Sequence, residues 1–497
     1  MRKHTFCILP FIHMQHKPSG QMKPCCRFEF HNKEYKTAEG GYVFDEHNLN
    51  NGATLSQSQN SELWESIRQK LLNNEMVGGC SKCYAEEDKT GFSMRTNENS
   101  LRNNEKQDGP ARDVSKPIIE YLEMTFGNYC NLKCRTCNAD LSSTWWEDEN
   151  KLVETGKYPD RFYYLNREGK KVVNVPFNWQ KEDFVNVKEI KFTGGEPMIH
   201  PDFLKLMDML IDMDVAKNIK LDVFTNCSWL PGEKYMSRLR KFKEIVLSLS
   251  IDGVGKVNEY IRHPSKWEVV DAAVTEWLTL EHENRQHIQV IWNPTINIYN
   301  IAELGSMVEW WFEKNDSIDE NWIALTVEAF KDDIEIVPAS KLKFNVLQDP
   351  SYLSISMLKA IDWSVREKII CEMLSAIAQL DWRNKKTQQY LLKKNLILGL
   401  YNTEVPLQVK DELKEKIATL LQDNEYVSHT FIADTKIKFR KIINNAKAGG
   451  GSLNDVREFL EYTNDLDKLR DEKFEDVFPV LHNAIMKTLE EKQNDKQ

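Results

Sequence analysis

Three cysteines with short spacing are the residues of this chain best suited to chemistry. Cys130, Cys134 and Cys137 form a CxxxCxxC arrangement directly after an apolar run that ends in MTFGNY. Three thiolates this close together can bind three irons of a [4Fe–4S] cluster and leave the fourth iron open to a small molecule. Zinc is the alternative, because it binds the same thiolates, although it would need a fourth nearby ligand. The spacing therefore predicts a reactive iron–sulfur site.

A second chemical signal ends the next apolar run, in the sequence KFTGGEP. Gly194 and Gly195 allow close approach of the backbone, and Glu196, which precedes Pro197, can accept a hydrogen bond from an ammonium group. Alone, such a segment would be an ordinary turn. Its position at the end of the strand that follows the cysteine loop predicts that it faces the same site.

A second group of cysteines lies near the N-terminus: Cys7, Cys25, Cys80 and Cys83, the last two in a CxxC. Four thiolates are enough to close one iron–sulfur cluster, and a structural four-cysteine zinc site is the alternative. Cys26 is a spare thiol that could replace Cys25. Cysteines clustered at short spacings, in a chain where we find no export signal, indicate metal ligation and not a secreted disulfide framework.

The elements that must position these residues follow from the hydrophobic pattern. Six strand-like runs occupy 118–127, 187–195, 219–226, 244–253, 287–296 and 342–348. Amphipathic, helix-like segments separate them, which predicts an α/β fold with a parallel sheet, either open or bent into a barrel. After about residue 352 helical periodicity takes over, with helices expected at 407–425, 431–447 and 453–473 and with Ser452 as an N-cap.

Composition shifts divide the chain into four predicted regions. They are a cysteine-rich region (1–90), a polar linker (91–116), an α/β core (117–348) and a mainly helical C-terminal region (349–497). The 66 basic and 76 acidic residues give a net charge of −10, which argues against a broad electrostatic grip on nucleic-acid phosphates. No apolar run approaches the roughly 20 residues of a membrane helix, and no signal-peptide pattern is present, so we expect a cytoplasmic protein.

The CxxxCxxC after the first core strand and the GGEP after the second resemble the radical S-adenosylmethionine (SAM) superfamily. That resemblance implies a partial (β/α)6 TIM-like barrel. In the N-terminal region, twelve residues separate Cys7 from Gly20 and four separate Gly20 from Cys25, with the CxxC at Cys80 further on. This resembles the first half of the SPASM auxiliary-cluster pattern, whose truncated form is called a twitch domain. The runs 344–355 and 466–481 look like the same group of proteins.

The resemblance also implies ligands and roles. SAM would bind the open iron through its amino and carboxylate groups, with residues 194–197 receiving the amino group. Asn226 would lie at the end of the third core strand, in the same site. Ser250, Asp252 and Arg262 would lie near the SAM ribose and carboxylate. The alternatives are that Ser250 and Asp252 cap a strand end and that Arg262 forms a surface salt bridge. No aromatic residue precedes the third cysteine, so Phe126 or Tyr129 is expected to cover the adenine.

The function implied is hydrogen abstraction by a 5′-deoxyadenosyl radical made from SAM. The auxiliary cluster, held by the N-terminal cysteines, is expected to be a [4Fe–4S] cluster, and an electron donor such as flavodoxin or ferredoxin is expected as a partner. A peptide or protein side chain is the preferred substrate. A small-molecule or nucleotide-derived substrate is the second hypothesis, and a non-catalytic iron–sulfur or zinc scaffold is the third. No side chain is assigned as catalytic.

Overall fold

The structure is a computed structural model, and it describes residues 4–158, 174–175, 179–230, 232–284, 287–318, 345–347, 350–361 and 452–494. Everything below concerns these residues. Among them, no helix is both long enough and apolar enough to cross a membrane.

A seven-stranded sheet organises the molecule, with the strand order β2-β1-β3-β4-β5-β6-β7. Its strands are β1 (His13–His16), β2 (Met22–Lys23), β3 (Tyr121–Met124), β4 (Glu189–Phe192), β5 (Lys220–Thr225), β6 (Glu244–Leu249) and β7 (Ile288–Trp292). All neighbours from β1 to β7 pair in parallel, and only β2 is antiparallel to its neighbour. Since the strands run the same way, the segments that follow β3, β4, β5 and β6 meet at one edge of the sheet.

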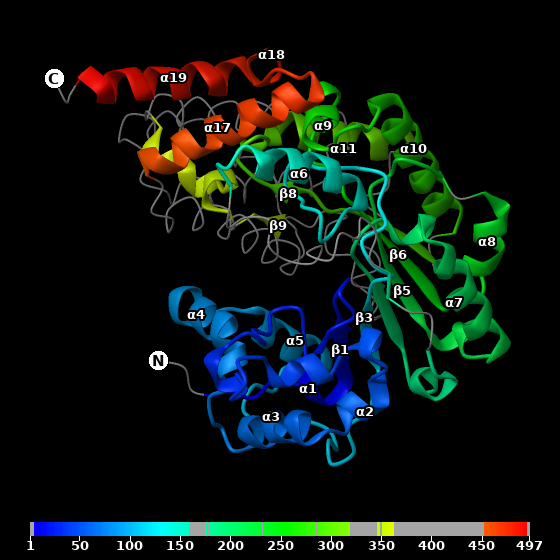
Figure 1. Cartoon of the computed structure of the whole chain (residues 1–497). Coiled ribbons are helices and arrows are strands. Elements are labelled where there is room, and N and C mark those ends of the chain that lie inside the picture. Colours follow the sequence, from blue (N-terminus) through cyan, green and yellow to red (C-terminus); the bar gives the residue numbers. More distant parts are fainter. Residues whose placement is uncertain are drawn as a thin grey trace, which may run out of the picture.

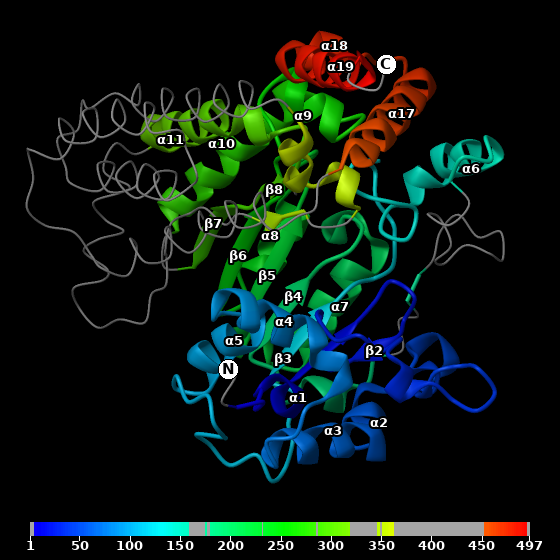
Figure 2. The ribbon, with the colours of Figure 1, turned by 90° about the vertical axis from the view of Figure 1, so that its left-hand side faces the viewer.

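Helices surround this sheet in three groups (Figure 1). The N-terminal group is α1 (Leu9–Ile12), α2 (Leu55–Gln59), α3 (Glu62–Leu72), α4 (Ser81–Thr90) and α5 (Met94–Arg102). The core group is α6 (Trp146–Glu154), α7 (Pro201–Asp212), α8 (Glu233–Leu239), α9 (Lys256–Ile261), α10 (Trp267–Glu283) and α11 (Leu304–Ile318). The C-terminal group is α17 (Leu453–Arg470), α18 (Phe474–Val477) and α19 (Pro479–Asn494). In both ribbon views the C-terminal group lies beside α9, at the opposite end of the molecule from α1–α3 (Figure 2).

The predicted core strands are confirmed where the structure describes them. Five of the six runs contain β3 to β7, and β5 shows why the pattern is readable, because Leu221, Val223 and Thr225 are buried while the residues between them are only half-buried. The last run contributes β9 (Asn345–Val346), which pairs with β8 (Thr295–Ile296) in a separate two-stranded sheet. The parallel α/β sheet is therefore established, whereas closure into a partial barrel stays a prediction.

Strand β1 was not predicted from the sequence. Its four residues, HMQH, carry no apolar alternation, yet it pairs in parallel with β3 and extends the core sheet. Both histidines are buried, and burial lowers the pKa of each, His13 and His16, to about 4. They are therefore neutral at pH 7, which allows them to occupy an interior position. The N-terminal cysteine-rich region is thus joined to the sheet of the core.

Two further segments refine the expected organisation. Part of the predicted polar linker forms α5, which begins with a capping box between Ser93 and Thr96. At the other end of the chain, Ser452 caps α17 as predicted, because its side chain accepts a hydrogen bond from the Asp455 amide. The helices expected at 407–425 and 431–447 lie outside the described residues. The boundaries of the four regions stay predictions.

Candidate functional site

The three clustered thiols lie in the loop that leaves β3. Cys130, Cys134 and Cys137 are all free and partly exposed, and each is close enough to the other two to influence their ionisation. Burial, reinforced by the neighbouring Cys134 thiol, raises the pKa of Cys130 to about 12, and the pKa of Cys137 is raised for the same reasons. Three thiols that influence one another's ionisation form a donor set whose protons would be displaced by iron.

The glycine pair lets the turn after β4 pack against this loop. Gly194 and Gly195 have φ of +73° and +58°, a region that favours glycine. A Cβ on Gly195 would lie 2.3 Å from the Tyr129 carbonyl oxygen, and one on Gly194 would lie 2.5 Å from Thr125 Oγ1. The sequence predicted that these glycines allow the backbone to approach another group closely. In the structure that group is the protein's own segment after β3.

Glu196 has one carboxylate oxygen that is available to a ligand. The side chain is 1% exposed, and its Oε2 accepts a hydrogen bond of 2.7 Å from the Asn226 amide. Its Oε1 is buried and has no hydrogen-bond partner among the described residues. Burial raises the pKa of Glu196 to about 7, against smaller opposing effects of the hydrogen bonds from the Asn226 amide and the Thr225 side chain and of the nearby Arg262. A buried acceptor without a donor is a position where a hydrogen-bond donor of a ligand would be stabilised.

Asn226 connects Glu196 to the cysteine loop. Its side-chain amide donates to Asn131 Oδ1 at 3.0 Å, and the same nitrogen lies 4.0 Å from Cys130 Sγ. The next residue, Cys227, is fully buried with φ +56°, so it behaves as a small core residue. Asn131 was not singled out in the sequence, although its place inside the CxxxCxxC motif could have indicated it.

Asp252 and Arg262 reach the same loop from β6 and α9. Arg262 Nε lies 2.9 Å from Asp252 Oδ2, and Arg262 Nη1 donates to Cys134 Sγ at 3.7 Å. Arg262 is only 8% exposed, so it is not the surface salt bridge considered above. Asp252 is buried and holds Arg262 in place, while its other oxygen accepts from the Thr295 amide. Ser250 is half-buried beside the end of β5, where its amide donates to the Thr225 carbonyl.

The two aromatic residues proposed to cover an adenine differ in availability. Phe126 is buried and stacks on Phe192 and His200, with ring centroids 5.6 and 5.2 Å apart. Tyr129, directly before the first cysteine of the motif, is 41% exposed. Of the pair, Tyr129 alone offers an open ring face.

The N-terminal cysteines converge as a second group of four. Every pair among Cys7, Cys25, Cys80 and Cys83 is close enough for one thiol to raise the pKa of another, in addition to the larger effect of burial. Cys26 points elsewhere: its pKa is raised to about 11 by burial and by Glu123, and its sulfur lies 3.4 Å from the sulfur of Met94. Cys25 thus influences the ionisation of Cys7, Cys80 and Cys83, whereas Cys26 lies beside Cys25 and contacts Met94.

Arg95 of α5 supports this second group. It is buried, pairs with Glu87 at 2.6 Å and donates to the carbonyl of Phe6, next to Cys7. It was not identified from the sequence because it lies in the segment expected to be a linker. Within the part of the chain that is described, no three His, Cys, Asp or Glu side chains are close enough together to hold a single metal ion, so the thiols of each cysteine group lie further apart than the ligands of one ion.

Comparison with known proteins identifies the domain around the first site. Residues 124–280 match the family model of the radical SAM superfamily. A curated relative named GTP 3′,8-cyclase, from Campylobacter lari, is 27% identical over 27% of this chain and 35% of its own length. The chain thus spans about a third of the relative it matches.

Two solved structures show more distant likeness. The AdoMet-bound structure of anSMEcpe is 14% identical and covers 75% of this chain and 98% of its own, with a TM-score of 0.34. Streptococcus suis SuiB bound to precursor peptide SuiA is 16% identical, covers 50% and 54%, and has a TM-score of 0.25.

Proposed function

We propose, from the radical SAM domain that this chain contains, that the protein is a radical SAM enzyme whose first site is built by Cys130, Cys134 and Cys137. Radical SAM domains bind a [4Fe–4S] cluster and SAM, and the three thiols fit that cluster because they lie in one loop, influence one another's ionisation and would leave one iron without a protein ligand. When bound, the reduced cluster and SAM supply a 5′-deoxyadenosyl radical that abstracts hydrogen from the substrate.

The observation that carries the proposal is the unpartnered Glu196 Oε1 beside the thiol loop. In our proposal this oxygen accepts a hydrogen bond from the SAM amino group, and residues 194–197 form the turn that presents it. Asn226 fixes the carboxylate through its amide. Arg262, held by Asp252, places a positive charge near Cys134 and on the side expected for the SAM carboxylate.

The second site, Cys7, Cys25, Cys80 and Cys83, is proposed to hold the auxiliary cluster. All four ligand positions of a [4Fe–4S] cluster would then come from protein thiols, so this cluster has no open iron. Cys7 lies on the segment that leads into β1, and β1 pairs with β3, from which the loop of the first site leaves. It is proposed to accept an electron from the substrate radical or to help hold the substrate.

For the substrate we propose a peptide or protein side chain, on the strength of the SPASM-like N-terminal cysteine pattern. The second candidate is a nucleotide-derived substrate, which the relative named GTP 3′,8-cyclase favours. The test is anaerobic turnover of the reduced protein with GTP or with candidate peptides, each followed by mass spectrometry. Consumption of GTP above the rate without protein would replace the peptide proposal, and a peptide product would support it.

The proposed role of Glu196 gives the first prediction. Glu196→Gln removes the negative charge without changing the shape, so a charge-assisted hydrogen bond worth about 1.5 to 3 kcal/mol is lost and SAM binds roughly ten- to a hundredfold more weakly.

The pH dependence of SAM binding gives a second prediction. Because the raised pKa of about 7 keeps the carboxyl protonated below that pH, wild-type affinity should rise about tenfold between pH 6 and 8.

Calorimetry with SAM across this pH range measures both effects. Glu189→Gln is a matched control, since Glu189 lies at the other end of β4 and pairs with Arg102 instead. The stability of the free protein moves in the opposite direction to binding, because a carboxyl whose pKa is raised from 4.5 to about 7 by folding loses its contribution to stability as the pH rises from about 4.5 through 7. Equal SAM affinity and equal pH dependence in Glu196→Gln and wild type would remove the residue from the site.

A further inference from the structure

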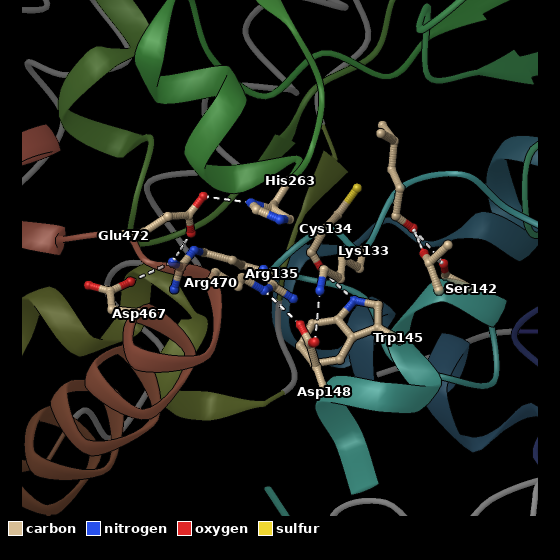
Figure 3. A network of polar contacts seen from close by, with 12 residues as sticks. Lys133, Cys134, Arg135, Ser142, Trp145, Asp148, His263, Asp467, Arg470 and Glu472 are labelled. Atoms are coloured by element: carbon tan, nitrogen blue, oxygen red, sulfur yellow. Dashed lines mark hydrogen bonds and ion pairs between the residues drawn. The ribbon is translucent and has the colours of Figure 1, made fainter. Parts of the chain in front are cut away.

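Three consecutive residues of the cysteine loop, Lys133, Cys134 and Arg135, are tied to the C-terminal helix. Their contacts lead to a set of residues on and just after α17, called here the clamp: Tyr462, Asp467, Arg470 and Glu472. Figure 3 shows Asp467, Arg470 and Glu472 of the clamp beside Arg135, with Asp148 of α6 on the other side of the loop. The two ends of the Arg135–Asp467 contact are separated by 332 residues in the sequence.

Arg135 is the centre of the arrangement. Its side chain is fully buried, and one guanidinium nitrogen lies 2.5 Å from Asp467 and 2.5 Å from Glu472. The guanidinium stacks 3.6 Å from the Tyr260 ring centroid, and its Nε donates to the Tyr260 carbonyl. The Arg135 carbonyl in turn accepts from the Tyr462 hydroxyl. A buried guanidinium is tolerated only when it is paired, so this loop conformation depends on the two clamp carboxylates.

Lys133 and Cys134 are connected to the clamp through α6. Lys133 Nζ and Arg470 Nε bind the two oxygens of Asp148, at 2.7 and 2.8 Å. The Cys134 carbonyl accepts a 2.8 Å hydrogen bond from Trp145 Nε1, and Arg470 covers the Trp145 ring at 4.7 Å. The backbone of Cys134, a proposed ligand of the first cluster, is therefore held by Trp145, and Arg470 of the clamp packs against that tryptophan.

His263 closes the same network from the core side. Its carbonyl accepts from the Lys133 amide at 2.7 Å, and its ring lies 2.7 Å from Glu472 Oε1. Although burial opposes ionisation, the contacts with His263 and Arg135 lower the pKa of Glu472, so the carboxylate is charged at neutral pH. These hydrogen bonds and ion pairs, with the packing of Arg470 on Trp145, connect the Cys134 backbone to the clamp.

We propose that the clamp acts as a positioning device for the cluster loop, with Arg135 and Asp467 as its central positioning residues. This inference rests on the proposed function, because it assigns the clamp the task of holding the Cys134 thiol where the cluster needs it. Without the clamp the fold of the core would remain, while the cluster would be bound less firmly and in a different geometry. The C-terminal region would then be a part of the cofactor site and not an appendage.

The test is the variant Asp467→Asn/Glu472→Gln in the full-length protein, reconstituted anaerobically. Loss of supporting contacts of this kind typically weakens metal binding about 10- to 100-fold, so iron should pass to a chelator about tenfold faster than in wild type. The EPR spectrum of the reduced protein should also change its response to SAM, because SAM binds only at the cluster with an open iron. Asp465→Asn is the matched control, since Asp465 lies on the same helix but pairs with Lys157.

A purely structural role for the clamp predicts a different result. The melting temperature would fall, but the chelation rate and the SAM-dependent EPR change of the folded protein would equal those of wild type, and this outcome would overturn the inference. If the double variant does not fold, Tyr462→Phe serves instead, because it removes only the hydroxyl that contacts the Arg135 carbonyl. A wild-type protein that shows no SAM-dependent EPR change would overturn the proposed function itself, which distinguishes the two failures.

Discussion

The variant Cys130→Ala/Cys134→Ala/Cys137→Ala is expected to release no 5′-deoxyadenosine and to retain about four of the roughly eight irons bound by wild-type protein. The reason is that SAM cleavage needs an iron without a protein ligand, and of the two proposed cysteine groups it is the three-thiol group that would leave one. The four N-terminal thiols are left intact by this variant and should keep their own cluster. Iron analysis and chromatography of the nucleoside after reduction with dithionite measure the two effects.

Cys227→Ala is the control for this experiment. Cys227 is a fully buried thiol in the turn after β5, and its removal should change neither the iron content nor the SAM cleavage. A colourless wild-type protein that carries stoichiometric zinc after anaerobic reconstitution would contradict the cluster prediction. It would favour the scaffold hypothesis instead.

Removing the second group of thiols should separate SAM cleavage from substrate turnover. The variant Cys80→Ala/Cys83→Ala is expected to lose about half its iron and yet to release 5′-deoxyadenosine with dithionite, because the three-thiol loop is built from other segments. Conversion of the true substrate should be lost if the auxiliary cluster passes electrons or positions the substrate. The measurements are iron content, 5′-deoxyadenosine and product, beside a thermal melt.

The neighbouring thiol provides a sharp control for this variant. Cys26→Ala should leave the iron content unchanged, since Cys26 contacts Met94 and is influenced by Glu123, and Cys25 is the proposed ligand of the adjacent pair. If the N-terminal cysteines are only a folding staple, Cys80→Ala/Cys83→Ala would lose solubility and SAM cleavage together. Full substrate turnover by that variant would contradict both the proposed role in electron transfer and a purely structural role of these cysteines in stabilising the fold.

The core strands were predictable because each buries alternate residues or a short apolar run, as β5 does with Leu221 and Val223. Strand β1 was not, since its pairing with β3 and the burial of His13 and His16 depend on tertiary contacts that leave no periodic signal in four residues. Local periodicity therefore revealed the strands whose own apolar residues alternate or run together. It missed β1, which is stabilised by its pairing with β2 and β3.

The candidate site shows the same division. The spacing of Cys130, Cys134 and Cys137 indicated the first group, because the ligands lie within one loop. The sequence predicted Cys25 as a ligand and left Cys26 open as a replacement, since the directions of adjacent side chains depend on where Cys80 lies in space. The role of Arg135 was equally hidden, because its partners are synthesised more than three hundred residues later.

The pairing of β1 with β3 has a practical consequence for any attempt to dissect this protein. A version that began at residue 117 would leave β3 with an unpaired backbone edge, which is a template for aggregation. It would also remove Arg102, whose guanidinium pairs with Glu189 and lies 4.2 Å from the Tyr121 ring centroid. The first hundred residues are therefore not a detachable module. Shortened or chimeric versions should retain them, or replace β1 with a strand of equivalent register.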